Sequence, residues 1–446
     1  MHSAIFSPFS LFLHYTCRMK IHIDLDCFFV SAERTVDAAL EGKPVAIGGR
    51  GDPYIFSGTA SNQELLIDNG GAFVGAFFHR YQGDDLKQYI DPDGRIRGIV
   101  TTASYEARAF GVKTGMSLRE ALGRCPSLIV KAPNMRLYHR LSRALHDFLQ
   151  ERIPLVEQAS IDEFYGDLEG WVPDEEIPEF TDALRHAIKK HLRLPVSIGA
   201  AHSKYLAKLA TDEAKPFGCR TLFPDQIAAF TRSVAVEKFP GLGKSIQRRC
   251  REYRLETLGD LLRAEPLVRS WGPYASALYD RISGHELGEL SLRAPRKSIG
   301  ISRTFDPVYD RDELRRRVAI LSRHLAYAIH KLEVYPTTYT LSLHYLHYPK
   351  AHYSLTEARL FSERRFRTLA LSLFSRADAH PLGAVNHLGL SASHFSSQTH
   401  RVFSLLDYES DVHERSLDTA AVSIRNKYGL NILRWGNEFR SEENSL

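Results

Sequence analysis

Two short acidic clusters, far apart along the chain and each set in a strand-like run, constrain this sequence most. The first, Asp24 and Asp26, lies within Ile-His-Ile-Asp-Leu-Asp-Cys-Phe-Phe, and the second, Asp162 and Glu163, lies within Ala-Ser-Ile-Asp-Glu-Phe. Carboxylates at strand ends can converge on divalent metal ions, and oxygen ligands of this kind suit Mg²⁺. Two metal ions held in this way can clamp the attacking and leaving oxygens of a phosphoryl transfer. If the two strands are neighbours, the pattern indicates a nucleotidyl-transfer site.

Each cluster is weak evidence when it stands alone. Asp24 and Asp26 lie two apart on a strand, so their side chains share a face, but many strands end in such a pair. Glycosyltransferases also use D-x-D to hold a metal–nucleotide-sugar, which leaves that class open as an alternative. An adjacent acidic pair such as Asp162 and Glu163 is usually a solvated turn. The prediction of a metal site therefore depends on the other motifs of the chain.

Composition sets the scale of the chain and the kind of partner it suits. A length of 446 residues favours several domains rather than one core, and 43% hydrophobic with 25% charged residues is typical of a globular protein. The net charge of +5 and the pI near 8.8 are compatible with a polyanionic partner without demanding one. Basic residues with aromatic or aliphatic residues between them fit either a nucleic-acid track or a solvated surface, and they gather in segments 244–254, 293–303 and 361–367.

Cysteine usage and hydropathy indicate the compartment. The five cysteines are scattered without a C-x-x-C pair, which argues against a zinc site and a disulfide scaffold and for a reducing, cytoplasmic environment. No apolar run reaches the ~18 residues that span a bilayer, so no membrane association is expected. Residues 1–17 are apolar and aromatic but lack the basic region and cleavage site of a signal peptide. We expect Met19 to be the natural start, with residues 1–18 over-called or disordered.

Local patterns predict a mixture of helices and strands in which a helix-backed sheet carries the metal site and a separate small α/β domain follows. Residues 50–97 break the pattern, because they are rich in Gly and Asp around an apolar stretch. The expected elements are a strand at 20–30, a helix at 31–40, a strand at 45–47, helices at 104–110, 135–152 and 178–192, a strand at 196–200, a helix at 203–216, short helices over 223–288, a helix at 312–333 and strands at 337–344.

Three residues have the character of triphosphate ligands. Tyr105 and Arg108 lie three apart on one face of a predicted helix, and a tyrosine hydroxyl with a forked guanidinium suits triphosphate oxygens. Lys215, which precedes Pro216 and Gly218, can add a third phosphate contact as a point charge. Taken singly, these residues are as readily explained by an exposed helix face and a solvent-facing lysine.

A glycine turn between two short helices has the spacing of a helix-hairpin-helix. Its sequence, Pro-Gly-Leu-Gly at 240–243, lets backbone N–H groups approach a DNA phosphate without reading the bases. A plain glycine turn is the alternative. The basic residues that follow it, Arg248, Arg249 and Arg251, favour DNA binding.

Six stretches of the chain, taken in order, resemble the motifs of the Y-family DNA polymerases, the translesion class. Together they cover about residues 19–400, and a chance match of all six in order is negligible. The stretches are Ile-Asp-Leu-Asp-Cys-Phe-Phe at 23–29, Thr-Ala-Ser-Tyr-Glu-Ala-Arg-Ala-Phe-Gly-Val at 102–112, Ser-Ile-Asp-Glu at 160–163, Ala-Lys-Pro-Phe-Gly at 214–218, Pro-Gly-Leu-Gly at 240–243 and Lys-Ser-Ile-Gly-Ile-Ser-Arg-Thr at 297–304.

The resemblance implies an α+β multidomain chain with the right-hand architecture of a polymerase. Its parts are a palm, fingers, a helical thumb and an α/β little-finger domain that grips the duplex. The implied boundaries are 19–27 and 132–222 for the palm, 28–131 for the fingers with an insertion at about 50–97, 223–290 for the thumb with its helix-hairpin-helix, 291–297 for a linker, 298–403 for the little finger and 404–446 for a C-terminal tail.

The activity that the resemblance implies is template-directed DNA synthesis past damaged bases, by two-metal nucleotidyl transfer and without proofreading. Asp24, Asp162, Glu163 and the Leu25 carbonyl would hold two Mg²⁺ ions, and Glu163 would lie nearest the primer 3′-hydroxyl. Asp26 is left between a metal role and a structural one. Primer–template DNA and deoxynucleoside triphosphates are the implied partners of a monomeric enzyme, with a sliding clamp as a further candidate.

Nucleotide and DNA contacts also come from the resemblance. Phe29 resembles the steric gate, a flat ring that leaves no room for a 2′-hydroxyl, whereas a core position fits Phe28 better. The full nucleotide-binding set is Phe28, Phe29, Thr102, Tyr105, Arg108 and Lys215. The implied DNA contacts are Gly241, Gly243 and Lys244 at the hairpin and Lys297, Ser298 and Arg303 on the DNA backbone at the entrance to the little finger.

The chain departs from the family pattern in two places. Roughly 45 extra residues separate the strand after Pro44 from the helix of Tyr105, which is far beyond ordinary loop lengths. We expect part of this insertion, with its apolar stretch at 71–78, to pack against the fingers; it is either a tolerated surface loop or a roof over the templating base. The C-terminus lacks a clear clamp-binding peptide, and residues 398–406 are only a degenerate candidate.

Two rival functions stay open on the sequence alone. A non-catalytic polymerase homologue that acts as a clamp-bound adaptor would be expected to lose its carboxylates, and here all are present. A D-x-D glycosyltransferase would not need a helix-hairpin-helix or a basic C-terminal domain. Primer extension on an undamaged template separates the three readings.

Overall fold

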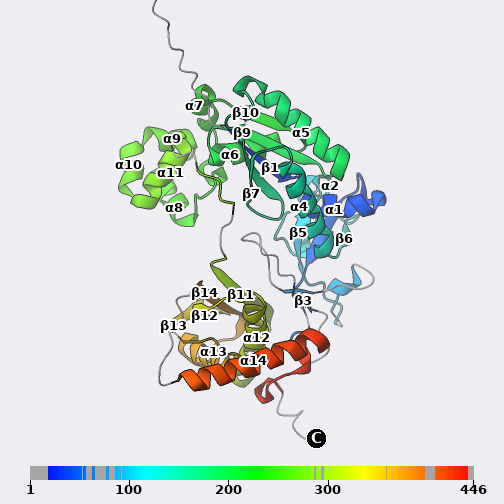
Figure 1. Cartoon of the computed structure of the whole chain (residues 1–446), viewed down its shortest axis with the longest axis vertical. Helices are drawn as coiled ribbons and strands as arrows, with labels where there is room; N and C mark the ends of the chain where they lie inside the picture. The colour runs from blue at the N-terminus through cyan, green and yellow to red at the C-terminus, as the bar shows by residue number, and fades with distance from the viewer. Residues whose placement is uncertain are drawn as a thin grey trace, which may run out of the picture. The chain divides into compact units, whose positions relative to one another are not determined.

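The computed structural model describes most of the chain, and the described part divides into two compact units (Figure 1). The first unit comprises Met1–Val45, Thr102–Arg108 and Asn134–Arg293, and the second comprises Ala46–Thr101, Ala109–Pro133 and Ala294–Leu446. The described residues are 19–52, 54–56, 63–65, 77–79, 86–91, 93–285, 288–292, 296–357, 359–396 and 407–439.

A five-stranded sheet forms the centre of the first unit, and the two acidic strands are neighbours in it, as the sequence requires. Asp24 lies directly opposite Glu163 in the register of an antiparallel pair. Only the outermost pair, β10 with β9, is parallel. The strand order is β10 (Cys219–Leu222), β9 (Val196–Ala201), β1 (Lys20–Leu25), β8 (Glu163–Asp167) and β7 (Leu155–Gln158).

The strand period of two residues sends the side chains of β1 to two different environments. Ile21, Ile23 and Leu25 belong to an apolar core shared with α4 (Met135–Gln150) and α5 (Ile177–Leu192). His22 and Asp24 point to the opposite face, which α6 (Lys204–Ala214) covers. One face of the strand therefore holds the fold together while the other presents polar groups to a helix.

Gly199 explains how closely α6 approaches the sheet. A Cβ at this position of β9 would collide with the Ala207 carbonyl oxygen and the Thr211 backbone nitrogen. The missing side chain lets the helix backbone lie directly on the strand. As a result, side chains of α6 reach the carboxylates of β1 and β8.

The first strand is shorter than the sequence suggests. We expected a strand over 20–30, but β1 ends at Leu25 and helix α1 (Phe28–Val36) begins two residues after Asp26. Cys27, at the start of that helix, has a left-handed backbone with φ of 39°, which turns the chain out of the strand direction. The Ser31 hydroxyl donates to the Asp26 carbonyl oxygen and secures the turn.

Short helices complete the first unit, as the pattern over 223–288 predicts, and they surround an apolar core of their own. Helix α6 contributes Leu206, Ala207 and Leu209 to that core. The remaining elements are η1 (Ala38–Leu40), α2 (Tyr105–Ala109), η3 (Asp174–Glu176), η4 (Pro224–Gln226), α7 (Ile227–Thr231), η5 (Val236–Lys238), α8 (Lys244–Glu252), α9 (Leu258–Arg263), α10 (Glu265–Ser270) and α11 (Pro273–Ser283).

The second unit is built around a four-stranded antiparallel sheet with two helices packed on one face (Figure 1). Apolar residues alternate along the strands toward those helices, and the other face carries mostly Ser, Thr and His. The strand order is β11 (Ser298–Val308), β14 (Val385–Phe395), β12 (Pro336–Tyr345) and β13 (Ala351–Thr356), and the helices are α12 (Arg311–Lys331) and α13 (Glu363–Ala377).

Smaller elements lie between β1 and β7 in sequence. They form a three-stranded sheet and a two-stranded ribbon. Separately, none of the helices among the described residues is long and apolar enough to cross a membrane. The three-stranded sheet has the order β5 (Ile99–Ala103), β2 (Val45–Gly49) and β6 (Ile129–Lys131), the ribbon pairs β3 (Gln63–Leu65) with β4 (Phe77–His79), and the helices are η2 (Lys87–Tyr89) and α3 (Leu118–Arg124).

Both ends of the insertion at about 50–97 pack into the second unit. Tyr89 is fully buried against Gly48 of β2, which agrees with the expectation that part of the insertion packs on the predicted fingers. Ile55, by contrast, is 6% exposed and belongs to the core of the four-stranded sheet and α12. The apolar stretch at 71–78 lies almost wholly outside the described residues, and a role as a roof over the templating base stays a prediction.

The C-terminal stretch is an ordered part of the second unit rather than a tail. Helix α14 (Tyr408–Tyr428) runs along its helical side, followed by η7 (Leu430–Ile432) and η8 (Gly436–Glu438) (Figure 1). Ion pairs join these elements to the rest of the unit. Arg425 of α14 pairs with Glu363 of α13, and both side chains are 2% exposed. Arg323 of α12 pairs with Glu438 at 2.9 Å. Buried pairs of this kind are costly to break from one side, so they fix the C-terminal elements in place.

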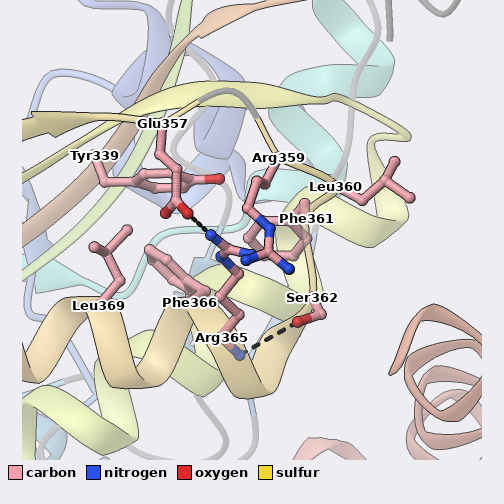
Figure 2. A pocket seen from close by; sticks show the side chains of 9 residues that line it. All are labelled: Tyr339, Glu357, Arg359, Leu360, Phe361, Ser362, Arg365, Phe366 and Leu369. Carbon is pink, nitrogen blue, oxygen red and sulfur yellow. Dashed lines mark hydrogen bonds and ion pairs between the residues drawn. The ribbon is translucent and has the colours of Figure 1, made fainter. Parts of the chain in front are cut away.

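A small pocket beside the start of α13 belongs to this anchorage. Figure 2 shows Arg365 reaching Glu357, with which it forms an ion pair, near the aromatic rings of Tyr339 and Phe366. The neighbouring Arg359 pairs with Asp411 of α14 at 2.7 Å. The cavity measures about 10 Å³, which is room for a single water molecule. It is too small for a ligand and serves the packing of α14.

Candidate active site

Helix α6 lays a row of polar side chains along the acidic strands. Lys204, Lys208 and Thr211 are spaced four and three residues apart, which places them on one helical face, and Lys215 is the extended residue directly after the helix. Each meets a partner on a strand, and three of the four partners are acidic. Lys204 contacts Glu157 of β7, Lys208 contacts Glu163 of β8, Thr211 contacts His22 of β1 and Lys215 contacts Asp24 of β1.

Asp24 lies at the centre of this row. Its carboxylate is 7% exposed and accepts a hydrogen bond of 2.6 Å from the Lys215 ammonium. Burial raises the pKa of Asp24 to about 7, and Lys215 limits the rise. A buried carboxylate with a single ammonium partner and two acidic neighbours has an unmet need for positive charge.

Glu163 faces Asp24 across the strand pair and is held from two sides. Lys208 donates to both of its oxygens at 2.5 Å, and the His22 ring nitrogen Nε2 lies 3.7 Å from Oε2. Burial acts to raise the pKa of Glu163, but the His22 and Lys208 contacts outweigh it and lower that pKa to about 2. Glu163 is therefore a carboxylate anion fixed in one orientation.

Asp162 lies next to this pair, and its carboxylate is bound to its own loop. Its Oδ1 atom accepts a hydrogen bond of 2.5 Å from the Ser160 hydroxyl. The backbone nitrogen of Leu25 donates to the Asp162 carbonyl oxygen at 3.0 Å, which ties the ends of the two acidic strands together. Burial raises the pKa of Asp162, and the neighbouring Glu163 adds to the rise. Three carboxylates and the Leu25 backbone thus meet at one edge of the sheet.

The donor set fits a hard divalent cation. Within the described residues, the group that could hold a metal ion comprises His22, Asp24 and Glu163, whose ligand atoms lie within 4.8 Å of one another. Carboxylate oxygens suit Mg²⁺, while burial lowers the pKa of His22 and keeps its ring neutral. His22 hydrogen-bonds Thr211 through Nδ1 at 2.9 Å, which orients the ring with Nε2 toward Glu163. We therefore regard His22 as a support for Glu163.

The predicted triphosphate ligands Tyr105, Arg108 and Lys215 come from α2 and from the end of α6. Arg108 is exposed, and its guanidinium lies 4.9 Å from the centre of the Tyr105 ring. The Tyr105 hydroxyl donates to Asp26 at 3.1 Å, and burial raises its pKa. Thr102, on β5, is half-buried. Because Lys215 pairs with Asp24, the structure links Tyr105 and Lys215 to the acidic strand β1.

The two phenylalanines after β1 differ in their environment, and Phe28 needs correction as a nucleotide contact. Phe28 is 2% exposed and belongs to the core under α4, so a nucleotide has no access to it. Phe29 is half-buried, and its ring stacks on Tyr138 at 4.4 Å with an angle of 10°. Of the two, only Phe29 combines a stacked ring with partial exposure to solvent.

The glycine hairpin before α8 has the features of a phosphate-binding turn. Gly241 has φ of +93°, a conformation that glycine adopts without strain, and the Tyr274 hydroxyl donates to its carbonyl oxygen at 2.7 Å. Gly243 and Lys244 are exposed at the start of α8, and Arg248 is exposed one turn further on. The hairpin therefore carries exposed positive charge at the start of α8, while the backbone N–H groups of Leu242 and Gly243 donate within the turn to Phe239 and Gly241.

The residues predicted at the entrance to the little finger do not share one surface. Lys297 and Ser298 are exposed at the start of β11. Arg303 lies on the opposite face of the strand, with Ile299 and Ile301, and its side chain would be 3.2 Å from a Cβ on Gly51 of the insertion. The structure thus separates Arg303 from Ser298, because residues an odd number apart alternate across a strand.

One of the basic segments is also used differently from the prediction. In segment 361–367, Arg365 pairs with Glu357, and Arg367 lies 3.8 Å from the centre of the Trp435 ring. These arginines hold the C-terminal elements, and DNA phosphates are not needed to explain them.

Sequence reasoning missed His22 and Lys208 as parts of this site, and it left Asp26 between a metal role and a structural one. The spacing of Lys204, Lys208 and Thr211 marks a polar helical face, but the sequence does not say which strand that face meets. His22 precedes Asp24 by two residues and therefore shares its face, which is a signal that could have been used.

Comparison with known proteins places the chain. A sequence model described as the impB/mucB/samB family matches residues 23–212, and the model of that family's C-terminal domain matches residues 296–405. DNA polymerase IV of Glaesserella parasuis serovar 5 is 30% identical over 324 residues, which are 70% of this chain and 76% of the relative. This chain belongs to the Y family of DNA polymerases.

Further relatives support the same membership. DNA polymerase IV of Lactococcus lactis subsp. cremoris strain SK11 is 29% identical over 392 residues, which cover 86% of this chain and 96% of the relative. The chain is a DNA-directed DNA polymerase of the translesion class. The expected family is therefore confirmed, and the glycosyltransferase alternative is excluded.

Solved structures agree on the fold. A Y-family DNA polymerase chimera aligns with a TM-score of 0.66 at 22% identity, covering 84% of this chain and 99% of the other. An insertion ternary complex of Dbh DNA polymerase aligns with a TM-score of 0.50 over the same shares at 20% identity. The predicted α+β multidomain polymerase fold is confirmed.

Proposed function

We propose that this polymerase extends primers past damaged bases by two-metal nucleotidyl transfer and without proofreading. The observation that carries the proposal is the pairing of β1 with β8, which sets Asp24 opposite Glu163 and brings Asp162 alongside. The absence of proofreading is included in the proposal because it is consistent with membership of the family.

The proposed metal ligands are Asp24, Asp162, Glu163 and the Leu25 carbonyl. Two Mg²⁺ ions bound there would activate the primer 3′-hydroxyl and neutralise the triphosphate. Lys208 and His22 support this role, because they hold Glu163 ionised and fixed in orientation. Lys215 forms an ion pair with Asp24 in this structure. If bound metal ions took over the charge of that carboxylate, the Lys215 ammonium would be free to contact a triphosphate.

The nucleotide contacts that we propose are Phe29, Thr102, Tyr105, Arg108 and Lys215. Arg108 supplies an exposed guanidinium, and Lys215 supplies a point charge next to the metal ligands. The stack of Phe29 on Tyr138 holds the ring in one plane, which is what a steric gate against a 2′-hydroxyl needs. A structural neighbour, Dbh DNA polymerase, has been solved as an insertion ternary complex, which supports nucleotide and DNA as partners.

The assignment of parts to a right hand is also a proposal. Residues 19–27 and 132–222 would form the palm, 28–131 the fingers, 223–290 the thumb and 298–403 the little finger. The thumb hairpin around Gly241, Gly243 and Lys244 would grip DNA phosphates, as would Lys297 and Ser298 at the start of β11. We further propose a cytoplasmic monomer recruited by a sliding clamp; the candidate peptide at 398–406 lies outside the described residues.

Primer extension tests the proposed activity. The purified chain with an undamaged primer–template, the four deoxynucleoside triphosphates and Mg²⁺ should add template-directed nucleotides, and a template with an abasic site should still allow extension. Labelled primer without nucleotides should stay intact if, as proposed, the chain has no proofreading exonuclease. Shortening of the primer would contradict the absence of proofreading, and no extension in any metal would favour a non-catalytic adaptor.

A further inference from the structure

Asp26 is the acidic residue of the first cluster that the metal site leaves unexplained. It lies one residue past the end of β1, and its side chain is 2% exposed. A buried carboxylate is stable only when hydrogen-bond donors surround it. Its oxygens accept from the Ser197 hydroxyl at 3.0 and 3.1 Å, from the Tyr105 hydroxyl at 3.1 Å and from the Phe217 backbone nitrogen at 2.7 Å.

Two of these donors, Tyr105 and Phe217, come from the segments that carry the proposed triphosphate ligands. Tyr105 opens helix α2 and is itself such a ligand, and Phe217 follows Lys215 by two residues. Ser197 lies on β9, in the body of the sheet, and therefore fixes the carboxylate to the fold. Asp26 thus connects the rigid sheet to both segments through one side chain.

The hydroxyl of Tyr105 makes the arrangement directional. A tyrosine has a single O–H proton, and here it is donated to Asp26, so Asp26 sets the position of the oxygen. Hydrogen bonds to an ionised acceptor are about twice as strong as neutral ones. The acceptor therefore fixes the position of the hydroxyl end of the ring relative to β1, and the Arg108 guanidinium lies 4.9 Å from the centre of the same ring.

We propose that Asp26 is a positioning residue, which holds Tyr105 and the Lys215 segment in the arrangement that receives the triphosphate of the incoming nucleotide. The proposal rests on the nucleotide-binding roles proposed above for Tyr105 and Lys215. It assigns no metal to Asp26, whose oxygens are occupied by donors from the protein. The rate of the chemical step then depends on Asp24, Asp162 and Glu163, while Asp26 governs nucleotide capture.

Single-nucleotide insertion kinetics on a fixed primer–template test this role. Asp26→Ala should raise the KM for the nucleotide about tenfold or more, the size of a lost hydrogen bond to a charged group, with a much smaller change in kcat. Asp26→Asn keeps one oxygen to accept from Phe217 and should fall between wild type and Asp26→Ala. The matched control is Ser31→Ala, which removes a buried bond to the Asp26 carbonyl oxygen and should leave the KM unchanged.

A double variant that lacks the two proposed nucleotide ligands, Tyr105 and Lys215, separates this proposal from the function on which it rests. In Tyr105→Phe/Lys215→Ala, adding Asp26→Ala should not raise the KM further, because its effect runs through those residues. An equal rise in that background would overturn the positioning role. If Tyr105→Phe/Lys215→Ala alone leaves the KM unchanged, the nucleotide-binding assignment fails instead. An Asp26→Asn protein with reduced thermal stability but wild-type KM would show that Asp26 only supports the fold.

Discussion

The insertion at about 50–97 should be a structural part of the second unit, and Ile55→Ala is the substitution that tests this most sharply. Ile55 is 6% exposed in the core of the four-stranded sheet and α12. Next to it the Phe56 ring meets Phe305 edge to face at 5.8 Å, and the Arg317 guanidinium lies over both rings. The Phe56 carbonyl oxygen also accepts from Arg316 at 2.8 Å.

The size of the effect follows from this burial. Truncating a core isoleucine to alanine costs about 2–5 kcal/mol, because transfer free energy is lost and a cavity remains. In a unit of this size each kcal/mol lowers Tm by about 2–4 °C. Ile90, in the same insertion, is 40% exposed. Ile90→Ala should stay within about 0.5 kcal/mol of the parent and is the matched control.

A single tryptophan can report this unit alone. Trp171 and Trp271 belong to the first unit, and Trp435 belongs to the second. Trp435 donates to Glu363 at 2.6 Å and lies under Arg367, so its fluorescence should change when the unit unfolds. In a Trp171→Phe/Trp271→Phe background, Ile55→Ala should shift the urea midpoint of Trp435 clearly downward. A midpoint equal to that of Ile90→Ala would show that Ile55 does not belong to the core.

Three further outcomes are expected. Phe29→Ala should open space for a 2′-hydroxyl and increase ribonucleotide insertion relative to deoxynucleotide insertion; an unchanged ratio would mean that another residue is the gate. Burial, together with His344, lowers the pKa of His387 from 6.5 to about 4, so this histidine binds a proton more readily in the unfolded chain. The stability of the second unit, followed by Trp435 fluorescence, should therefore fall as pH drops from about 6.5 to about 4. This pH dependence should be weaker in His387→Asn. DNA affinity should fall log-linearly with salt, and Arg248→Ala should reduce the slope by ~0.9 if Arg248 contacts a phosphate, whereas an equal slope would remove it from the DNA surface.

The sequence pointed to the strand pair that carries the site. Each acidic cluster lies in a strand-like run, and a shared metal would require those strands to be adjacent, as β1 and β8 are; the order of the whole sheet was not predicted. The contacts of Lys208 with Glu163 and of Thr211 with His22 were beyond reach, because they depend on how α6 crosses the sheet at Gly199. Helical spacing tells which residues share a face, but only packing tells what that face meets.

The C-terminal helix shows a second kind of limit. In α14 the buried positions are Asp411, Asp418 and Arg425, seven residues apart, while Leu417 and Ile424 are exposed. Hydrophobic periodicity therefore points to the wrong face of this helix, since its anchors are ion pairs with α13 and its neighbours. The same partners explain why the basic segment at 361–367 resembled a nucleic-acid track.

The insertion illustrates a third limit. Ile55 and Phe56 occur in a stretch rich in Gly and Asp, which is typical of a loop. Their core partners, such as Ile299 and Leu314, lie about 250 residues further along the chain. No local pattern records a contact over that distance.

The central claim is that Asp24, Asp162 and Glu163 form the catalytic metal site, and the most direct test is primer extension by Asp162→Ala/Glu163→Ala beside DNA binding measured on the same protein. Without these carboxylates, extension should be abolished while affinity for primer–template stays largely intact, because the proposed DNA grip lies elsewhere. The matched control is Glu175→Ala/Glu176→Ala, an exposed adjacent acidic pair in the same unit, which should extend primers normally. Extension by Asp162→Ala/Glu163→Ala at more than a few per cent of the control rate would contradict the assignment.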